Sequence, residues 1–276
     1  MLIKNQYEIK KIKEGGKILG SILSELAKMS KPGVSTLEVD ERAEELILKA
    51  GGKPAFKYYR SSPSDIPFPT TICASLNTGL VHGIAKKEDI LKDGDIFSID
   101  IGMQWPLNKE NTREDGRGWF TDMALTVAIG DIDKKTKELL RVTKKALEVG
   151  IKSIKPGLPV SVIGKEIEKY VKSQGDYGII RDLVGHGVGH EVHEEPRVPN
   201  YYDKNLDKFI MKPGMVLALE PMVSLGGHEI TTSNDGWTIE MADGSMSGHY
   251  EHTIVVTEKG CEVMTRRPME KLERFF

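Results

Sequence analysis

Apolar residues recur at helical spacing near the start of the chain. Between Gln6 and Met29 they stand three and four positions apart, with lysines between them, which predicts an amphipathic helix. Ser35 and Glu38 then have the spacing of a capping box and open a second helical pattern that reaches Gly51. The chain is therefore expected to begin with two helices separated by a Lys-Pro-Gly turn.

Shorter apolar runs farther along the chain predict strands, and two of these runs carry an acid. Residues 96–102 and 120–127 are rich in β-branched and aromatic side chains, with Asp100 in the first run and Asp122 in the second. Aspartate is depleted in strands and is rarely buried without a partner. The two aspartates are therefore candidate functional residues.

The second half of the chain repeats the plan of the first. A Lys-Pro-Gly turn again precedes a helical pattern at residues 155–171, and two later strand-like runs again carry acids. Glu220 stands in the position of Asp100, and Glu251 in that of Asp122. Sequence identity between the halves is weak, but chance explains four matched acids poorly. We expect a single catalytic domain, residues 1–276, with pseudo-twofold halves of approximately 5–130 and 134–260.

The four acids converge on one place if the halves pack about that axis. Buried carboxylates repel one another unless they are protonated or bound to cations. The pattern therefore indicates a metal site. His186 would add an imidazole nitrogen to the carboxylate oxygens, a set that suits two divalent ions with bridging carboxylates better than one tetrahedral zinc.

His186 belongs to the stretch that is richest in candidate chemistry, residues 185–196. It holds three histidines, His186, His190 and His193, among three glycines and three acids. Any one of these histidines alone is more simply a solvated loop residue. Three of them in a run broken by glycines favour a functional site.

Composition narrows the range of partners. The 276 residues are 39% hydrophobic and 29% charged, with a formal net charge of −2, so the whole molecule has no electrostatic bias toward nucleic acid or a membrane. The first residues lack the apolar core of a secretory signal, and no apolar run is long enough to span a bilayer. The two cysteines, Cys73 and Cys261, are far apart and are expected to be thiols. The cytoplasm is therefore the expected compartment.

Taken together, these motifs resemble the methionine aminopeptidases of type I, the short-chain form, within the pita-bread family that also includes aminopeptidase P and prolidase. The matching segments follow the family order over most of the chain: residues 73–84, 98–102, 121–122, 185–196, 219–222, 235–238 and 250–253. The resemblance implies an α+β pita-bread fold, in which two pseudo-twofold-related α/β halves form a curved antiparallel sheet. Helices would cover this sheet, and a central dimetal site would lie within it.

The resemblance also implies the metal ligands. Asp100 would be a terminal ligand of one ion, His186 and Glu220 would hold the other, and Asp122 and Glu251 would bridge the pair. A hydroxide between the two divalent ions (Co, Mn, Fe, Zn or Ni) would attack the carbonyl that follows the initiator methionine, its pKa lowered toward about 7. Glu220 would double as the general base.

Further residues would contact the substrate by the same resemblance. His193 would steady the oxyanion of the tetrahedral intermediate, and His82 would contact the peptide group on the leaving side. A thioether suits an apolar pocket because sulfur packs well against aromatic rings. For Val192, an ordinary place in the core is the competing interpretation. The residues that match the methionine pocket are Phe68, Cys73, Val192 and Trp237.

The sequence departs from the family pattern at three places. Residues 104–118 lengthen the gap between the two aspartates, so Asp115 competes with Asp122 for the bridging position. We prefer Asp122, because Asp115 and the glycine after it are typical of a turn, whereas Asp122 enters an alternating strand. His190 stands where no histidine is expected, either as a partly exposed loop residue or as a donor to a ligand. Residues 58–65 lengthen the segment before the pocket, which affects the expected pocket depth.

The implied function is the removal of the initiator methionine from nascent polypeptides by a metal-dependent aminopeptidase that acts as a monomer. One alternative is an X-Pro peptidase similar to prolidase or aminopeptidase P, which usually carries a large extra N-terminal domain. Another is a non-catalytic pita-bread module that binds peptide or ribosome, but all five ligand positions are filled here. The N-terminal lysines are most simply the solvated face of a helix, and docking on ribosomal RNA is the second interpretation.

Overall fold

The helices that the periodicity predicts in residues 6–29, 35–51 and 155–171 are present, as are the acid-bearing strands predicted at 96–102 and 120–127, and the structure adds a helix at residues 134–153. The computed structural model describes residues 2–60, 62–108, 112–268 and 270. The helices are α1 (Gln6–Met29), α2 (Thr36–Lys49), α3 (Lys134–Ser153), α4 (Ser161–Gln174) and the short 3-10 helix η1 (Lys204–Lys208). The strands are β1 (Lys53–Pro54), β2 (Ile72–Leu76), β3 (Gly79–Val81), β4 (Ile96–Trp105), β5 (Trp119–Ala128), β6 (Gly178–Ile179), β7 (Gly185–Gly187), β8 (Glu194–Val198), β9 (Val216–Leu219), β10 (Met222–Ser224), β11 (Ile230–Thr232), β12 (Ile239–Met241), β13 (Ser247–His249), β14 (His252–Thr257) and β15 (Gly260–Val263).

Capping hydrogen bonds set the starts of the first two helices. Asn5 and Glu8 form reciprocal side-chain to backbone bonds at the start of α1, and Ser35 and Glu38 do the same at the start of α2. Such a box satisfies N–H groups that have no partner inside the helix. The capping box predicted at Ser35 is thus confirmed. None of the helices in the described parts of the chain is both long and apolar enough to cross a membrane.

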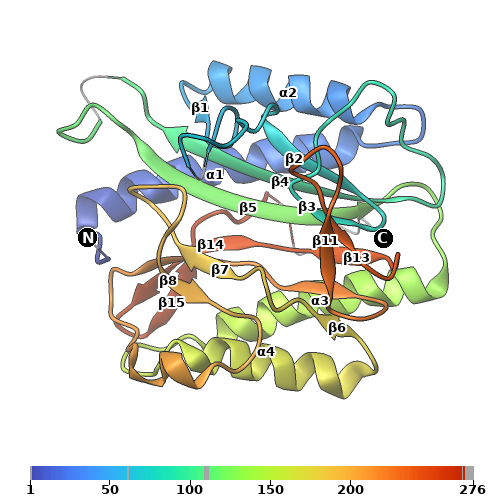
Figure 1. Ribbon diagram of the computed structural model, residues 1–276. Helices are drawn as coiled ribbons and strands as arrows, with labels where there is room; N and C mark the ends of the chain where they lie inside the picture. The colour runs from blue at the N-terminus through green and yellow to red at the C-terminus, as the bar shows by residue number, and fades with distance from the viewer. Residues whose placement is uncertain (1, 61, 109–111, 269, 271–276) are drawn as a thin grey trace.

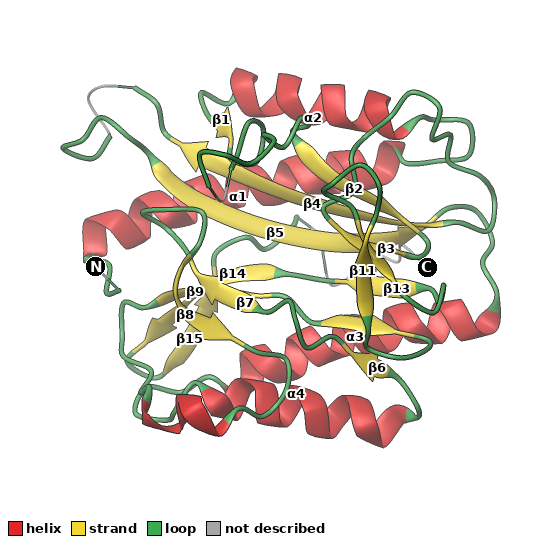
Figure 2. Cartoon of the chain, viewed as in Figure 1, coloured by secondary structure: helices red, strands yellow, loops and turns green. Residues whose placement is uncertain are grey.

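The helices lie in two groups with the strands between them (Figures 1 and 2). α1 packs against β4 and β5, whereas α3 packs against α4, β10 and β13. Apolar side chains fill the space between helix and strand, with Leu19 and Leu23 of α1 in the same core as Ile99 and Ile101 of β4. All strand pairs among the described residues are antiparallel, and the pair of β4 with β5 is the longest of them. The expected α+β fold, an antiparallel sheet covered by helices, is confirmed.

Each half of the chain contributes one antiparallel pair to the centre of the molecule. β4 and β5 pair along their full length, which places Asp100 and Asp122 on neighbouring strands. β9 pairs with β14, and His252 lies opposite Leu219. Glu220, directly after β9, and Glu251, directly before β14, therefore lie at adjoining strand ends. The boundaries of the two halves stay a prediction.

The two central pairs meet along β5 and β14. The hydroxyl of Thr253 accepts a hydrogen bond from the Asp122 backbone N–H at 3.0 Å and donates to the Asp122 carbonyl at 2.7 Å. The Glu251 N–H donates to the Ala124 carbonyl at 2.9 Å. Thr253 and Asp122 are 131 positions apart in the chain. This junction brings one acid from each half to the same point.

Candidate metal centre and active site

Strand geometry explains why the side chains of Asp100 and Asp122 point away from the helix-covered core. Successive side chains of a strand point to opposite faces of the sheet. Ile99 and Ile101 of β4 are fully buried beneath the helices, so Asp100 between them faces the other way. Met123 of β5 is also fully buried in this core, which turns Asp122 toward the same side as Asp100. The alternation of the two strands thus supplies two acids to one face.

The acids meet the imidazole of His186 on that face. A carboxylate oxygen of Asp122, one of Glu251 and a ring nitrogen of His186 all lie within 4.8 Å of one another. His186 Nε2 lies 3.5 Å from Glu220 Oε1 and 3.9 Å from Asp122 Oδ2. The carboxyl of Asp100 is in contact with that of Asp122. All five side chains that the sequence proposed as metal ligands are therefore together.

Burial dominates the electrostatics of this cluster. It raises the pKa of Asp100 to about 7, against the lowering effect of hydrogen bonds with Cys73 and Asp122. It also raises the pKa values of Asp122, Glu220 and Glu251 well above their usual range, and the charges of neighbouring carboxylates raise them further. Carboxyl groups in such a setting hold either protons or cations at neutral pH.

The unpartnered atoms of the cluster fit a bound cation. Asp100 Oδ1, Asp122 Oδ1 and Glu251 Oε1 are buried, and none of them has a hydrogen-bond partner among the residues that the structure describes. A buried acceptor without a partner is costly, so these oxygens are suited to a ligand that carries positive charge. Carboxylate oxygens combined with an imidazole nitrogen suit divalent transition metals. The side chains present therefore fit divalent metal ions.

His186 is oriented by its own backbone. Its Nδ1 lies 2.8 Å from the Gly187 carbonyl oxygen. Because a carbonyl can only accept, Nδ1 carries the proton in this bond and Nε2 keeps a free lone pair. Nε2 is the atom that faces Glu220 and Asp122. Burial, followed by the nearby His193, lowers the pKa of His186 to about 3, so the ring is neutral and able to bind a metal.

The cluster lines a cavity of about 180 Å³ whose other walls are aromatic and apolar. Phe68, Cys73 and Trp237 line it, and the rings of Phe68 and Trp237 meet edge to face with centroids 5.3 Å apart. Val192 packs in the same apolar group as Phe68 and Cys73, but it lines an adjacent groove. The proposed metal ligands and the apolar side chains therefore line the same cavity.

Two further imidazoles, those of His82 and His193, line the cavity. The ring of His193 meets that of His186 with centroids 4.5 Å apart, and its Nδ1 lies 3.0 Å from the Tyr59 hydroxyl. Burial and then His193 lower the pKa of His82 to about 4, and burial lowers the pKa of His193. Both rings are therefore neutral near pH 7, and each can donate one N–H.

Phe56, Tyr59 and His249 belong to the site although nothing in the sequence patterns singled them out. Phe56 and Tyr59 line the cavity from an irregular segment without periodicity. His249 is 1% exposed, and neither ring nitrogen has a hydrogen-bond partner among the described residues. Its Nε2 lies 3.7 Å from Glu220 Oε2. The available signal was its place two residues before Glu251.

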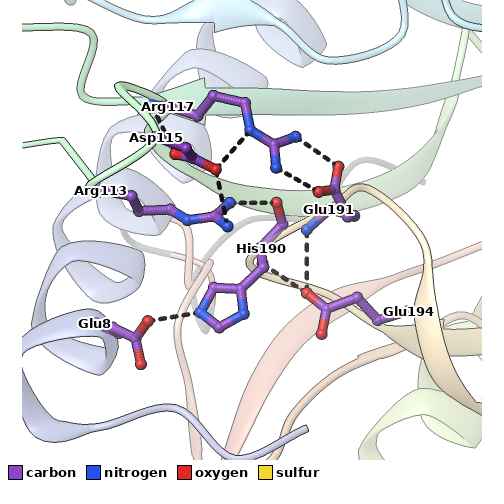
Figure 3. Close-up of polar contacts among 7 residues, drawn as sticks. All are labelled: Glu8, Arg113, Asp115, Arg117, His190, Glu191 and Glu194. Carbon is purple, nitrogen blue, oxygen red and sulfur yellow. Dashed lines mark hydrogen bonds and ion pairs between the residues drawn. The ribbon is translucent and has the colours of Figure 1, made fainter. Parts of the chain in front are cut away.

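Asp115 lies outside the cluster that contains Asp122. It stands in an exposed turn after β4, where Arg113 and Arg117 contact its carboxylate at 3.1 and 3.0 Å. The hydrogen bond from the Arg117 backbone N–H is the main cause that lowers the pKa of Asp115. His190 also points away from the cluster, with Nε2 2.6 Å from Glu8 Oε1 (Figure 3). These positions support Asp122 as the acid that could bridge metals.

The longer segment at residues 58–65 leaves the pocket walls in place. The Phe68 N–H donates to the Tyr59 carbonyl at 2.9 Å, and the Tyr58 N–H donates to the Phe68 carbonyl at 2.7 Å. These two bonds close the segment into a loop. Tyr59 and Phe68, which form these closing bonds, both line the cavity. Residue 61 within it lies outside the described residues.

Comparison with known proteins assigns the class of this site. Residues 10–258 match the model of metallopeptidase family M24. The chain therefore belongs to metallopeptidase family M24, which agrees with a cluster of side chains suited to divalent metal ions.

Within that family the chain is similar over nearly its whole length to methionine aminopeptidases. The methionine aminopeptidase of Borreliella burgdorferi is 43% identical over 256 residues, which cover 93% of this chain and 94% of the relative. The crystal structure of the methionine aminopeptidase of Thermotoga maritima matches with a TM-score of 0.87 and 39% identity, over 97% of this chain and 100% of the other. The prolidase of Pyrococcus horikoshii shares the fold at a TM-score of 0.72 and 24% identity, and the match covers 97% of this chain and 64% of that longer chain.

Proposed function

We propose that this chain removes the N-terminal methionine from nascent polypeptides, using two divalent ions. The observation that carries the proposal is the junction of a buried cluster of acids with a chamber of aromatic and sulfur-containing side chains. The first would hold the metal ions for hydrolysis of a peptide bond, and the second would select a methionine side chain. The similarity to methionine aminopeptidases over nearly the whole chain supports the same activity.

By the family resemblance, the five proposed ligands would divide between the two ions. Asp122 and Glu251 meet at the junction of the two halves and would bridge. Asp100 would complete the site of one ion, and His186 with Glu220 would complete the site of the other. When bound, the ions supply Lewis acidity toward the scissile carbonyl and a water molecule of low pKa. Their identity among Co, Mn, Fe, Zn and Ni is a matter of availability as well as of ligand type.

Three side chains of the cavity would act on the peptide. Glu220, which lines the cavity beside His186, would take up the proton of the attacking water. His193 would donate Nε2–H to the oxyanion, because the Tyr59 hydroxyl next to Nδ1 can hold that nitrogen as an acceptor. His82, a neutral donor on the same cavity, would contact the peptide group on the leaving side.

The methionine side chain would occupy the apolar part of the cavity. Its thioether would contact the rings of Phe68 and Trp237 and the sulfur of Cys73, contacts that favour sulfur over a plain hydrocarbon. Phe56 and Tyr59 extend this wall. Val192 would support it from the adjacent groove, where it packs beside Cys73.

Metal binding and substrate choice together test the proposed function. The purified chain should bind two Mn(II) or Co(II) ions and release methionine from Met-Ala-Ser, while an X-Pro dipeptide stays uncut. Binding of fewer than two ions, with Met-Ala-Ser intact, would exclude the enzyme and favour a peptide-binding module. Cleavage of the X-Pro dipeptide instead would favour a prolidase.

The role of His193 has its own test. Replacing His193→Ala should lower kcat by about a hundredfold or more, the usual effect of losing one oxyanion donor. Metal content should stay at the wild-type level, because the ring contacts His186 edge-on and does not join the acid cluster. Loss of metal in this variant would instead make His193 a ligand.

The proposed setting is the cytoplasm, with a monomer acting on chains as they leave the ribosome. The lysines of α1 are partly neutralised, since Lys11 pairs with Glu14 and Lys13 with Glu262. The solvated helix face therefore stays the simpler interpretation of these lysines. An electrostatic ribosome contact would weaken steeply as salt rises in a co-sedimentation assay, whereas salt-independent binding would contradict it.

A further inference from the structure

The loop that carries His193 has two faces with different surroundings. We call residues 189–194, from the connection after β7 to the first residue of β8, the His193 loop. Val192 packs with Phe68 and Cys73, and the ring of His193 meets that of His186, so these two residues face the site. His190, Glu191 and Glu194 turn to the opposite side and enter a polar network (Figure 3).

The turn between β4 and β5 holds the outward face of this loop. We call residues 112–118 of this turn the hairpin tip. The Arg117 guanidinium donates to both carboxylate oxygens of Glu191, at 2.9 and 2.7 Å. Arg113 Nη1 donates to the His190 carbonyl at 2.7 Å. At the base of the tip, the Phe120 N–H donates to the Gly189 carbonyl at 2.8 Å. Three consecutive loop residues are thus bound to one hairpin.

The arginines are themselves fixed by an acid of the tip. Asp115 Oδ2 lies 3.1 Å from Arg113 Nη2 and 3.0 Å from Arg117 Nε. The Arg113 N–H donates to the Arg117 carbonyl at 2.8 Å, which closes the turn. The contacts with Asp115 therefore hold both guanidinium groups in place where they meet the His193 loop (Figure 3). A planar guanidinium with two parallel bonds defines the geometry of its partner better than a single contact does.

The start of the chain holds the loop from the other side. Glu194 Oε1 accepts the N–H groups of His190 and Glu191, at 2.5 and 3.1 Å, while Lys4 Nζ lies 2.5 Å from Glu194 Oε2. One carboxylate oxygen of Glu8 accepts the Asn5 N–H at the start of α1. The other oxygen lies 2.6 Å from His190 Nε2. The loop residues on both sides of Val192 and His193 are therefore restrained. This restraint limits how far Val192 and His193 can move.

We propose that Arg113 and Arg117 of the hairpin tip are positioning residues for His193. Neither arginine lines the cavity, so they act through the backbone of the His193 loop. The inference rests on the proposed role of His193 as oxyanion donor. A shift of about 1 Å in a catalytic group is enough to cost a large part of its effect. Both arginines lie within residues 104–118, the segment expected to lengthen the gap between the two aspartates.

The competing explanation is a solvated surface network with no bearing on the reaction. Arg117 and Glu191 are 43% and 52% exposed, and an exposed ion pair usually contributes little. Arg141 offers a matched control: it is 46% exposed and binds Glu138 through two nitrogens on α3. Arg141→Met removes the same kind of contact far along the chain from the His193 loop. It should leave kcat unchanged.

Kinetics of the metal-loaded enzyme on Met-Ala-Ser separate the two explanations. Arg117→Met should lower kcat about threefold and Arg113→Met/Arg117→Met about tenfold, with KM within about twofold, because the substrate pocket is untouched. Arg117→Lys should recover part of the loss. Metal content and thermal midpoint should stay at wild-type values. A change confined to KM, or kcat within about twofold of wild type for the double variant, would overturn the proposal.

A cycle with His193→Ala shows whether the arginines act through that residue. If they only position His193, the double arginine change should lower the kcat of His193→Ala by no more than about twofold. An equal loss of about tenfold in both backgrounds would mean that the arginines act on the fold, which overturns the proposal. If His193→Ala itself keeps full kcat, the proposed role of His193 as oxyanion donor fails, and the proposed positioning role of the arginines fails with it. Should the double variant not fold, Arg117→Met and Arg117→Lys carry the same cycle.

Discussion

The acids of the central cluster and the acid of the hairpin tip have pKa values that are shifted in opposite directions. In the central cluster, burial and then neighbouring carboxylates raise the pKa values of Asp122 and Glu251. At the hairpin tip, Asp115 is exposed, and a backbone N–H together with the charges of Arg113 and Arg117 lowers its pKa. Both clusters face the stretch around His186 and His193, one from inside and one from outside.

The difference lies in where the positive charge comes from. At the hairpin tip the chain supplies its own cations, so each carboxylate oxygen that faces Arg117 is satisfied within the protein. In the centre, oxygens of Asp100, Asp122 and Glu251 have no partner among the described residues. An acid cluster that lacks cations of its own is available to an external one. Partner chemistry, rather than the number of acids, thus separates a metal centre from a structural ion network.

The largest expected effect comes from neutralising one acid in each cluster. Asp122→Asn should lower kcat/KM by at least about a thousandfold and reduce bound metal, because a metal centre supplies several kcal/mol of transition-state stabilisation. Asp115→Asn should change kcat/KM by no more than about threefold, since Arg113 and Arg117 keep their bonds to the loop. Metal content and Met-Ala-Ser cleavage measure both. Equal losses from the two variants would remove the distinction between the clusters.

Removing the metal should make stability depend on pH in a definite direction. The pKa of Asp100 is raised to about 7 in the folded chain, so the folded state holds this proton more tightly than the unfolded state does. The stabilisation is present at low pH and is lost as pH rises from about 4 through about 7. Bound metal replaces the proton and should flatten this dependence.

Unfolding in urea at about pH 5.5 and about pH 8 measures that difference. The chelated protein should lose stability relative to the metal-loaded protein on going to the higher pH. A chelated protein that gains stability over this range, relative to the loaded one, would contradict the raised pKa values of the acids.

Asp40 gives a third case, a buried acid that has hydrogen-bond donors within the protein. Its effect on the pH dependence of stability is expected to be smaller. Its Oδ1 accepts the N–H groups of Thr71 and Ile72 at 2.7 and 2.9 Å, and burial still raises its pKa to about 6. The folded chain therefore loses stability as pH rises from about 4 to about 6. Asp40→Asn keeps the acceptor and should lack this loss, so above about pH 6 it should be more stable than wild type by about 1–3 kcal/mol.

Thermal unfolding of wild type and variant across that range measures the effect. Asp40→Leu serves as the control. It does not titrate either, but it leaves two buried N–H groups without an acceptor, so it should be less stable than Asp40→Asn by about 1–3 kcal/mol at every pH. A variant Asp40→Asn that tracks the wild type at all pH values would mean that the two backbone hydrogen bonds outweigh burial.

The sequence by itself determined the local elements and the chemistry of the ligands. Apolar spacing placed α1 and α2, and Ser35 with Glu38 marked a helix start, because caps and periodicity depend on neighbours a few residues away. Acids inside strands were visible for a similar reason: Asp100 and Asp122 break an apolar pattern. Their counterparts Glu220 and Glu251 followed from the repeat, and the resemblance to methionine aminopeptidases added the roles.

Only the tertiary structure decided which other residues join them. Phe56 and Tyr59 lie in a segment without periodicity, and His249 faces Glu220 across a strand connection. The bonds from the hairpin tip to Glu191 join residues that are 74 positions apart. Such contacts leave no local pattern in the chain, because they arise when whole strands and loops pack. Asp100 and Asp122 could be singled out because an acid interrupts the apolar pattern of its own strand. The cavity walls and the contacts of the hairpin tip interrupt no such pattern, so the neighbouring sequence does not mark them.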